Sequence, residues 1–201
     1  MDFNKNESRF IRRWTVATVV GFTLGSPFTL GVIVLHGMGG GFENVSTYIK
    51  FGTLAGLILG TLIGFCQKLT LIGQASRLNW WIRASILGGT LGGFILGGLL
   101  KLSGKMNSDL IFLVILAMPG IIIGIAQSFV LMKSFKKAPL WGCISVNIIA
   151  WTVTQHVLFS GILSSQLYPG PTLLTLLFSG AILGLITGIY LTWLLSNFKK
   201  E

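Results

Sequence analysis

The residues with the most chemistry to offer lie in one apolar stretch, 140–163. Asn147, Trp151 and Gln155 recur every four residues, so a helix places them on one stripe, and His156 lies on a second polar face. Amide, indole and imidazole groups can bind a small molecule, and polar groups inside a membrane are candidates for function. If the protein binds a small molecule, these four residues are its predicted site; for His156 alone, a neutral histidine bonded to one neighbour is the preferred interpretation.

Carboxylates are nearly absent from the apolar stretches. The five acids lie at the termini, in loops or at a membrane edge: Asp2, Glu7, Glu43, Asp109 and Glu201. Coupled transport generally uses an intramembrane carboxylate, although backbone carbonyls can also bind sodium. The sequence has no paired carboxylates for acid–base catalysis, no metal-binding cluster and no phosphate-binding loop. We therefore expect no enzymatic activity, no cofactor and no metal.

The composition predicts an integral membrane protein. Of 201 residues, 52% are hydrophobic and 10% are charged, with a mean hydropathy of +0.81. A spanning helix needs roughly 20 mostly apolar residues. The apolar runs of this chain are too long for the strands of a membrane barrel, and they lack the alternation of apolar and polar residues that such strands show. The sequence predicts one all-α domain, 1–201, with six transmembrane helices at about 14–35, 49–70, 80–100, 110–132, 140–163 and 172–195.

Basic residues indicate the orientation of these spans. With six spans, twelve of the fifteen Lys and Arg residues fall on the side that holds both termini, and three fall on the other side. The positive-inside rule then places both termini in the cytoplasm. We interpret the net charge of +10 as this topology signal together with contact to anionic lipid headgroups, and not as nucleic-acid binding.

A motif recurs every sixty residues in the second, fourth and sixth spans. It is Gly-x-x-x-Gly-x-x-Gln/Thr-x-x-x-Leu, a spacing that occupies one helical stripe. The copies are Gly60, Gly64, Gln67 and Leu71; Gly120, Gly124, Gln127 and Leu131; and Gly180, Gly184, Thr187 and Leu191. Small residues on such a stripe let helix backbones approach closely in lipid.

The odd-numbered spans share a second pattern, Trp with a hydroxyl at +4 and small residues at +7 and +11. The copies are Trp14, Thr18, Gly21 and Gly25; Trp81, Ser85, Gly88 and Gly92; and, more loosely, Trp141, Ser145, Ile148 and Thr152. The chain is therefore predicted to consist of tandem two-helix repeats.

These two patterns predict specific polar contacts between helices. Residues at similar depth should pair as Gln67–Ser85, Gln127–Ser145 and Thr187–Thr18. The third pair would bring the sixth helix against the first, which predicts a ring with pseudo-threefold closure. As an alternative, Gln67, Gln127 and Thr187 could line a central polar constriction.

The recurring glycine–glutamine motif, followed by a basic loop and Trp-x-x-x-Ser, resembles a group of uncharacterised multi-spanning membrane proteins of bacteria, abundant in cyanobacteria. The resemblance covers nearly the whole chain, and the sixth span departs from it because Thr187 replaces the glutamine. It implies a bacterial inner or thylakoid membrane and supplies no activity.

Two functions follow from the sequence. The first is a non-enzymatic structural, assembly or interaction component, whose partners are the lipid bilayer and another membrane protein. The alternative is a small-solute or lipid transporter component with its ligand site on the fifth span. A central cavity that meets the fifth span would favour the alternative, and a ring packed solid through its glycines would favour the first.

Overall fold

The computed structural model describes residues 4–37, 44–72, 80–103, 109–134, 140–164 and 169–197, with side chains for 4–28, 44–72, 80–99, 118–133, 141–158 and 173–197. The described chain forms six α-helices. They are α1 (Lys5–Gly37), α2 (Val45–Leu71), α3 (Trp81–Ser103), α4 (Asp109–Ser134), α5 (Leu140–Ser164) and α6 (Pro169–Asn197). Five of the six predicted stretches fall inside one of these helices, and the third begins one residue before its helix. Helix α1 begins nine residues before the predicted stretch 14–35.

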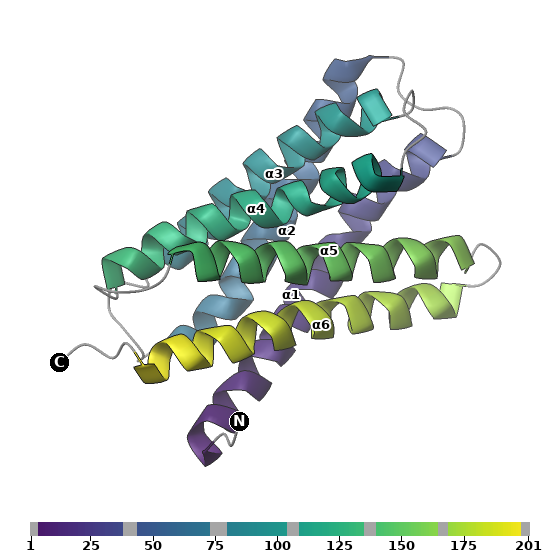
Figure 1. Ribbon diagram of the computed structural model, residues 1–201. Helices are drawn as coiled ribbons and strands as arrows, with labels where there is room; N and C mark the ends of the chain where they lie inside the picture. The colour runs from purple at the N-terminus through teal and green to yellow at the C-terminus, as the bar shows by residue number, and fades with distance from the viewer. Residues whose placement is uncertain are drawn as a thin grey trace.

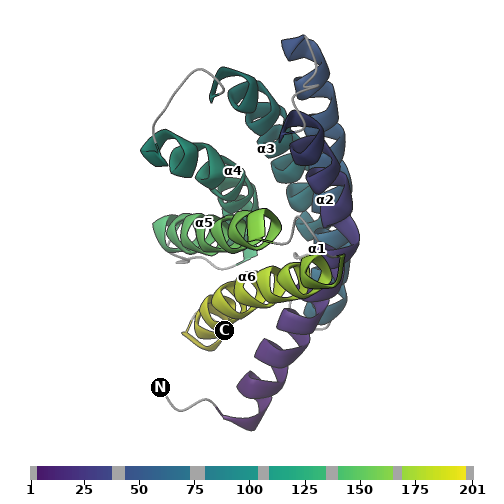
Figure 2. The same cartoon turned by 90° about the vertical axis from the view of Figure 1, so that its right-hand side faces the viewer.

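The helices follow one another in chain order around the bundle. Each helix packs against the next one along the chain, and α6 packs against α1. Figures 1 and 2 show α1 and α6 from perpendicular directions. The start of α1 and the end of α6 lie at the same end of the bundle (Figure 1), which we call the terminal end.

Length and composition suit three of the described helices to a membrane. Within the described residues, three segments are long and apolar enough to cross one, namely Val45–Leu71, Trp81–Leu99 and Leu173–Asn197, and Met118–Lys133 is a shorter apolar segment.

The start of α1 is fixed by a capping box. The side chain of Asn4 accepts hydrogen bonds from the backbone N–H groups of Asn6 and Glu7, and the Glu7 carboxylate accepts one from the N–H of Asn4.

Helices α2 and α3 approach until their backbones touch. Gly52, Gly56 and Gly60 of α2 face Gly89, Gly93 and Gly97 of α3. A Cβ atom on Gly56 would collide with the carbonyl oxygen of Gly89, and one on Gly93 would collide with that of Gly52. Only glycine permits this separation, so the two helices form one closely packed pair.

Glycines also mediate contacts at the next interfaces. A Cβ on Gly21 of α1 would lie 2.7 Å from the Cα of Ile63, and one on Gly88 of α3 would lie 2.8 Å from the Cα of Ile123. The contact between α6 and α1 is of the same kind, because a Cβ on Gly184 would lie 2.8 Å from the Cα of Thr15.

An apolar cluster fills the terminal end of the bundle. It contains the leucines of the three motif copies, which are almost fully buried and come from three different helices. Its largest members are the indoles of Trp14 and Trp81, whose ring centroids lie 5.6 Å apart in an edge-to-face arrangement. We call this cluster the plug: Trp14, Leu71, Trp81, Leu131, Cys143, Leu191 and their buried apolar neighbours.

The backbone contact of α2 with α3 makes a prediction about two neighbouring positions. We expect Gly56→Ala to lower stability by about 1–3 kcal/mol, because the added methyl group would force the helices apart. Gly98→Ala is the control, since its methyl group would meet only the Ile49 side chain at 3.8 Å. Thermal unfolding in detergent measures both, and equal midpoints for the two variants would contradict the role assigned to Gly56.

Candidate functional site

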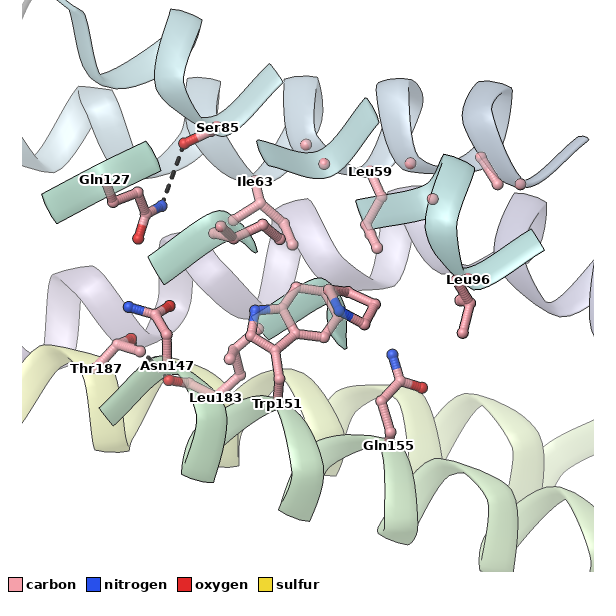
Figure 3. Close-up of a pocket in the computed structure, with 18 of the residues that line it drawn as sticks. Leu59, Ile63, Ser85, Leu96, Gln127, Asn147, Trp151, Gln155, Leu183 and Thr187 are labelled. Carbon is pink, nitrogen blue, oxygen red and sulfur yellow. Dashed lines mark hydrogen bonds between the residues drawn. The ribbon is translucent and has the colours of Figure 1, made fainter. Parts of the chain in front are cut away.

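A narrow cavity lies inside the bundle, next to the plug. It offers about 50 Å³ to the centres of water molecules, whereas a single water needs roughly 10–15 Å³ measured in this way. Its wall includes backbone of α2 and α3 and side chains from α2 to α6 (Figure 3). The polar side chains that line it are Gln67, Ser85, Gln127, Asn147, Trp151, Gln155 and Thr187.

Three of the four predicted ligand-binding residues meet in this cavity. Asn147, Trp151 and Gln155 are 5%, 2% and 4% exposed, and they line the cavity from a single stripe of α5. Figure 3 shows the Trp151 indole across the middle of the cavity and the Gln155 amide beside it. The prediction of one polar stripe is therefore correct for these three side chains.

The buried polar groups of α5 differ in how they are satisfied. The amide nitrogen of Asn147 donates to the carbonyl oxygen of Cys143 at 3.0 Å. Within the described part of the chain, the amide of Gln155 has no hydrogen-bond partner, and neither has the indole N–H of Trp151. Both residues line the cavity, so these two groups are available to water or to a bound molecule.

His156 departs from the prediction. Its side chain is exposed on the outer face of α5 and does not line the cavity. Consecutive residues of a helix point about 100° apart, so a helix that turns Gln155 inward directs His156 outward. The cavity therefore brings together three of the four predicted residues, and His156, the only ionisable one, lies apart from them.

A layer of hydrogen bonds separates the cavity from the plug. Gln67 joins three helices, because its amide nitrogen donates to Thr18 Oγ1 at 3.1 Å and its amide oxygen accepts from Trp81 Nε1 at 3.1 Å. The amide nitrogen of Gln127 faces Ser85 Oγ at 3.3 Å. Each glutamine thus bonds back to the odd-numbered helix that precedes it.

The contact of α6 with α1 carries the third polar link. The indole N–H of Trp14 donates to Thr187 Oγ1 at 3.0 Å, and Trp14 is only 1% exposed. This bond has the same form as the bond from Trp81 to Gln67, with tryptophan as the donor and the motif residue as the acceptor.

The predicted pairs were wrong in their partners. Gln67 bonds to Thr18 instead of Ser85, and Gln127 bonds to Ser85 instead of Ser145. Thr187 accepts from the tryptophan of α1 instead of meeting Thr18. Similar depth placed these residues in one layer but did not decide which neighbouring helix each would face.

Ser145 lies outside the polar layer because α5 is rotated relative to the other odd-numbered helices. Its side chain is exposed, as is that of Trp141. A Cβ on Gly64 would approach the Cβ of Ser85, and a Cβ on Gly124 would approach that of Asn147 at 3.0 Å. Asn147 therefore occupies the position that the sequence pattern assigned to Ser145.

If the pattern of the odd-numbered spans begins at Cys143 instead of Trp141, its four positions fall on buried residues of α5. The shifted positions are Cys143, Asn147, Ala150 and Thr154, each nine-tenths buried or more. Thr154 lies against α6, where its hydroxyl is 3.3 Å from the carbonyl oxygen of Ser179. The sequence did not single out Cys143, Ala150 and Thr154 for this face, because Trp141 and Ser145 matched the residue types of the pattern better. The small size of the three missed residues, at helical spacing, was the signal that could have found them.

The cavity is uncharged. Among the described residues none with a charged side chain lines it, and no three His, Cys, Asp or Glu residues are grouped to hold a metal ion. Its wall offers amide, hydroxyl and indole groups beside apolar surface from residues such as Leu59, Ile63 and Leu183. Such a site suits a neutral molecule, because an unpaired buried charge is strongly unfavourable.

The hydrogen bonds of Gln67 yield a prediction for stability. We expect Gln67→Leu to destabilise the protein by about 1–3 kcal/mol, because Trp81 and Thr18 lose their shared partner while nearly fully buried. Thr90→Val is the control, since the Thr90 hydroxyl bonds only to a carbonyl oxygen of its own helix. Thermal unfolding in detergent measures both, and an unchanged midpoint for Gln67→Leu would contradict the role of this layer.

Comparison with known proteins supplies no assignment. No family model, no curated protein and no solved structure matches the chain. The function must therefore be argued from the geometry of the cavity.

Proposed function

We propose that the protein is a six-span membrane protein that binds a small uncharged polar solute in its central cavity, as a component of a transporter. The observation that carries this proposal is Gln155, a residue that is only 4% exposed, lines the cavity and forms no hydrogen bond to another described residue. Its amide can therefore bond to a molecule in the cavity. A ligand that takes the place of water there would gain about the net free energy of one hydrogen bond, roughly 0.5–1.5 kcal/mol.

The chemistry of the wall defines the solute. Gln155 can donate and accept hydrogen bonds, and Trp151 presents both an N–H donor and a flat aromatic ring. Because the wall carries no charge within the described residues, a neutral molecule with hydrogen-bonding groups on one side and an apolar face on the other is the best complement.

The pseudo-threefold ring forms part of this proposal. The even-numbered helices keep the sixty-residue interval, and the packing of α1 on α2 recurs between α3 and α4. A Cβ on Gly25 would lie 3.0 Å from the Cα of Leu59, and a Cβ on Gly92 would lie 3.0 Å from that of Pro119. The Trp14–Thr187 bond between α1 and α6 supports closure of the ring.

In this proposal the cavity lies near the axis of the ring. Gln67, Gln127 and Thr187 occupy equivalent positions in the three motif copies, and all three line the cavity. All three also bond to neighbouring helices. The motif residues thereby combine the two roles that the sequence left open, contact between helices and the lining of a central polar space.

The sequence favoured an interaction or assembly component over a transporter component, and that role stays a prediction. We now prefer the transporter-type function because the bundle contains a cavity that meets α5. A bundle packed solid through its glycines would have supported the interaction role instead.

Ligand retention should depend on Gln155. We expect native mass spectrometry of gently purified protein to detect a bound small molecule, and Gln155→Leu to reduce its affinity about tenfold, the equivalent of one hydrogen bond of about 1.4 kcal/mol. His156→Leu is the matched control, because the adjacent side chain is exposed on the outer face of α5.

Two outcomes would contradict the proposal. One is an equal loss of the molecule in both variants, which would place its site elsewhere. The other is purification with a protein subunit and an empty cavity, which would favour the interaction role.

Topology can be tested independently of the ligand. With both termini in the cytoplasm, we expect a green fluorescent protein fused after α6 to be fluorescent in a bacterial host, and alkaline phosphatase at the same position to be inactive. An alkaline phosphatase fusion after α3 should be active. The reverse pattern at both positions would contradict the proposed orientation.

A further inference from the structure

A wide groove opens at the terminal end, on the outside of the bundle and apart from the cavity. It lies between the first half of α1 and the last turns of α2 and α6, and its volume is about 970 Å³. Three arginines of α1 line it, namely Arg9, Arg12 and Arg13. We call it the arginine groove.

The wall of the arginine groove changes from basic to apolar along α1. Arg9, Arg13, Val16 and Val20 are spaced as one helical face, so the valines continue the line of the arginines toward the middle of the helix. Both valines are exposed, at 57% and 44%. A molecule in the groove would thus meet positive charge at one end and open apolar surface at the other.

The opposite wall matches this gradient. Leu69 and Ile72, near the end of α2, line the groove and are 54% and 67% exposed. Two helices therefore present large apolar side chains to the same open space, next to the arginines. Such a surface fits a hydrocarbon chain better than water.

The positive charge of the groove is largely uncompensated. Among the described residues, none of the three arginines forms an ion pair with an acid. The one acid in the wall is Glu7, and its carboxylate caps the start of α1 by accepting from the N–H of Asn4. Guanidinium groups bind phosphate oxygens through paired hydrogen bonds.

We propose that the arginine groove binds one anionic phospholipid. The arginines hold the phosphate, and an acyl chain lies along Val16, Val20 and Leu69. Basic pockets between helices on the cytoplasmic side are suited to anionic headgroups. This proposal rests on the membrane orientation given above, and it does not depend on a ligand in the central cavity.

Lipid titration of the full chain in detergent, followed by native mass spectrometry, tests the proposal. Phosphatidylglycerol is the anionic probe and phosphatidylcholine the neutral one. We expect one phosphatidylglycerol to bind at least tenfold more tightly than phosphatidylcholine. The double variant Arg12→Gln/Arg13→Gln should lower the affinity for phosphatidylglycerol about 10- to 30-fold and leave that for phosphatidylcholine unchanged.

A matched variant separates the groove from general charge attraction. Arg83→Gln/Lys133→Gln removes the same charge from the same end of the bundle, where both residues lie over the Trp80 ring. This control should retain phosphatidylglycerol. An equal loss in both double variants would overturn the proposal, because any basic residue at this end would then serve.

A second pair of measurements separates a lipid site from a simple anion site. Val20→Ser should weaken phosphatidylglycerol binding while leaving any binding of inorganic phosphate unchanged. Competition by inorganic phosphate at the same concentration as the lipid would show a free-anion site and overturn the proposal. Because Arg12, Arg13 and Val20 are exposed, each variant of the groove should keep the unfolding midpoint of the parent protein.

Discussion

The contact of a glycine on one helix with the backbone of the next is the constraint on which this bundle depends. In lipid, apolar side chains gain little by leaving their surroundings, so helices associate through close packing and hydrogen bonds. Gly21 against Ile63 sets the distance between α1 and α2, and Gly56 against Gly89 sets the distance between α2 and α3. These two distances bring Gln67 within reach of both Thr18 and Trp81, which form part of the polar layer.

The positions of the helices and the stripe of motif residues could be predicted from the sequence, because long apolar runs and a fixed repeat interval can be recognised without knowing which helices are neighbours. The hydrogen-bond partners of the polar residues could not be predicted. Gln67 and Ser85 do lie at similar depth, yet Gln67 turns toward Thr18 and leaves Ser85 to Gln127. Depth along a helix is encoded locally, whereas the choice between two adjacent helices depends on rotations that emerge only when all of them pack.

The fifth helix shows why a good match in sequence can mislead. Trp141 and Ser145 preserve the residue types of the pattern, but both are exposed, and Asn147 occupies the packed position against Gly124. This rotation also brings Trp151 and Gln155 to the cavity. The departure from the repeat and the candidate ligand site therefore have one origin, since the helix that is rotated is the helix that supplies the distinctive polar groups.

The backbone contact of α2 with α3 limits how the protein can change shape. Because each helix lacks a Cβ where the other's carbonyl groups approach, neither can slide or rotate without a steric collision, so the pair moves as one rigid body. The plug takes side chains from this pair and from the other helices. Any motion that parts the plug would therefore displace α2 and α3 together against the rest of the bundle, as a shear or hinge motion.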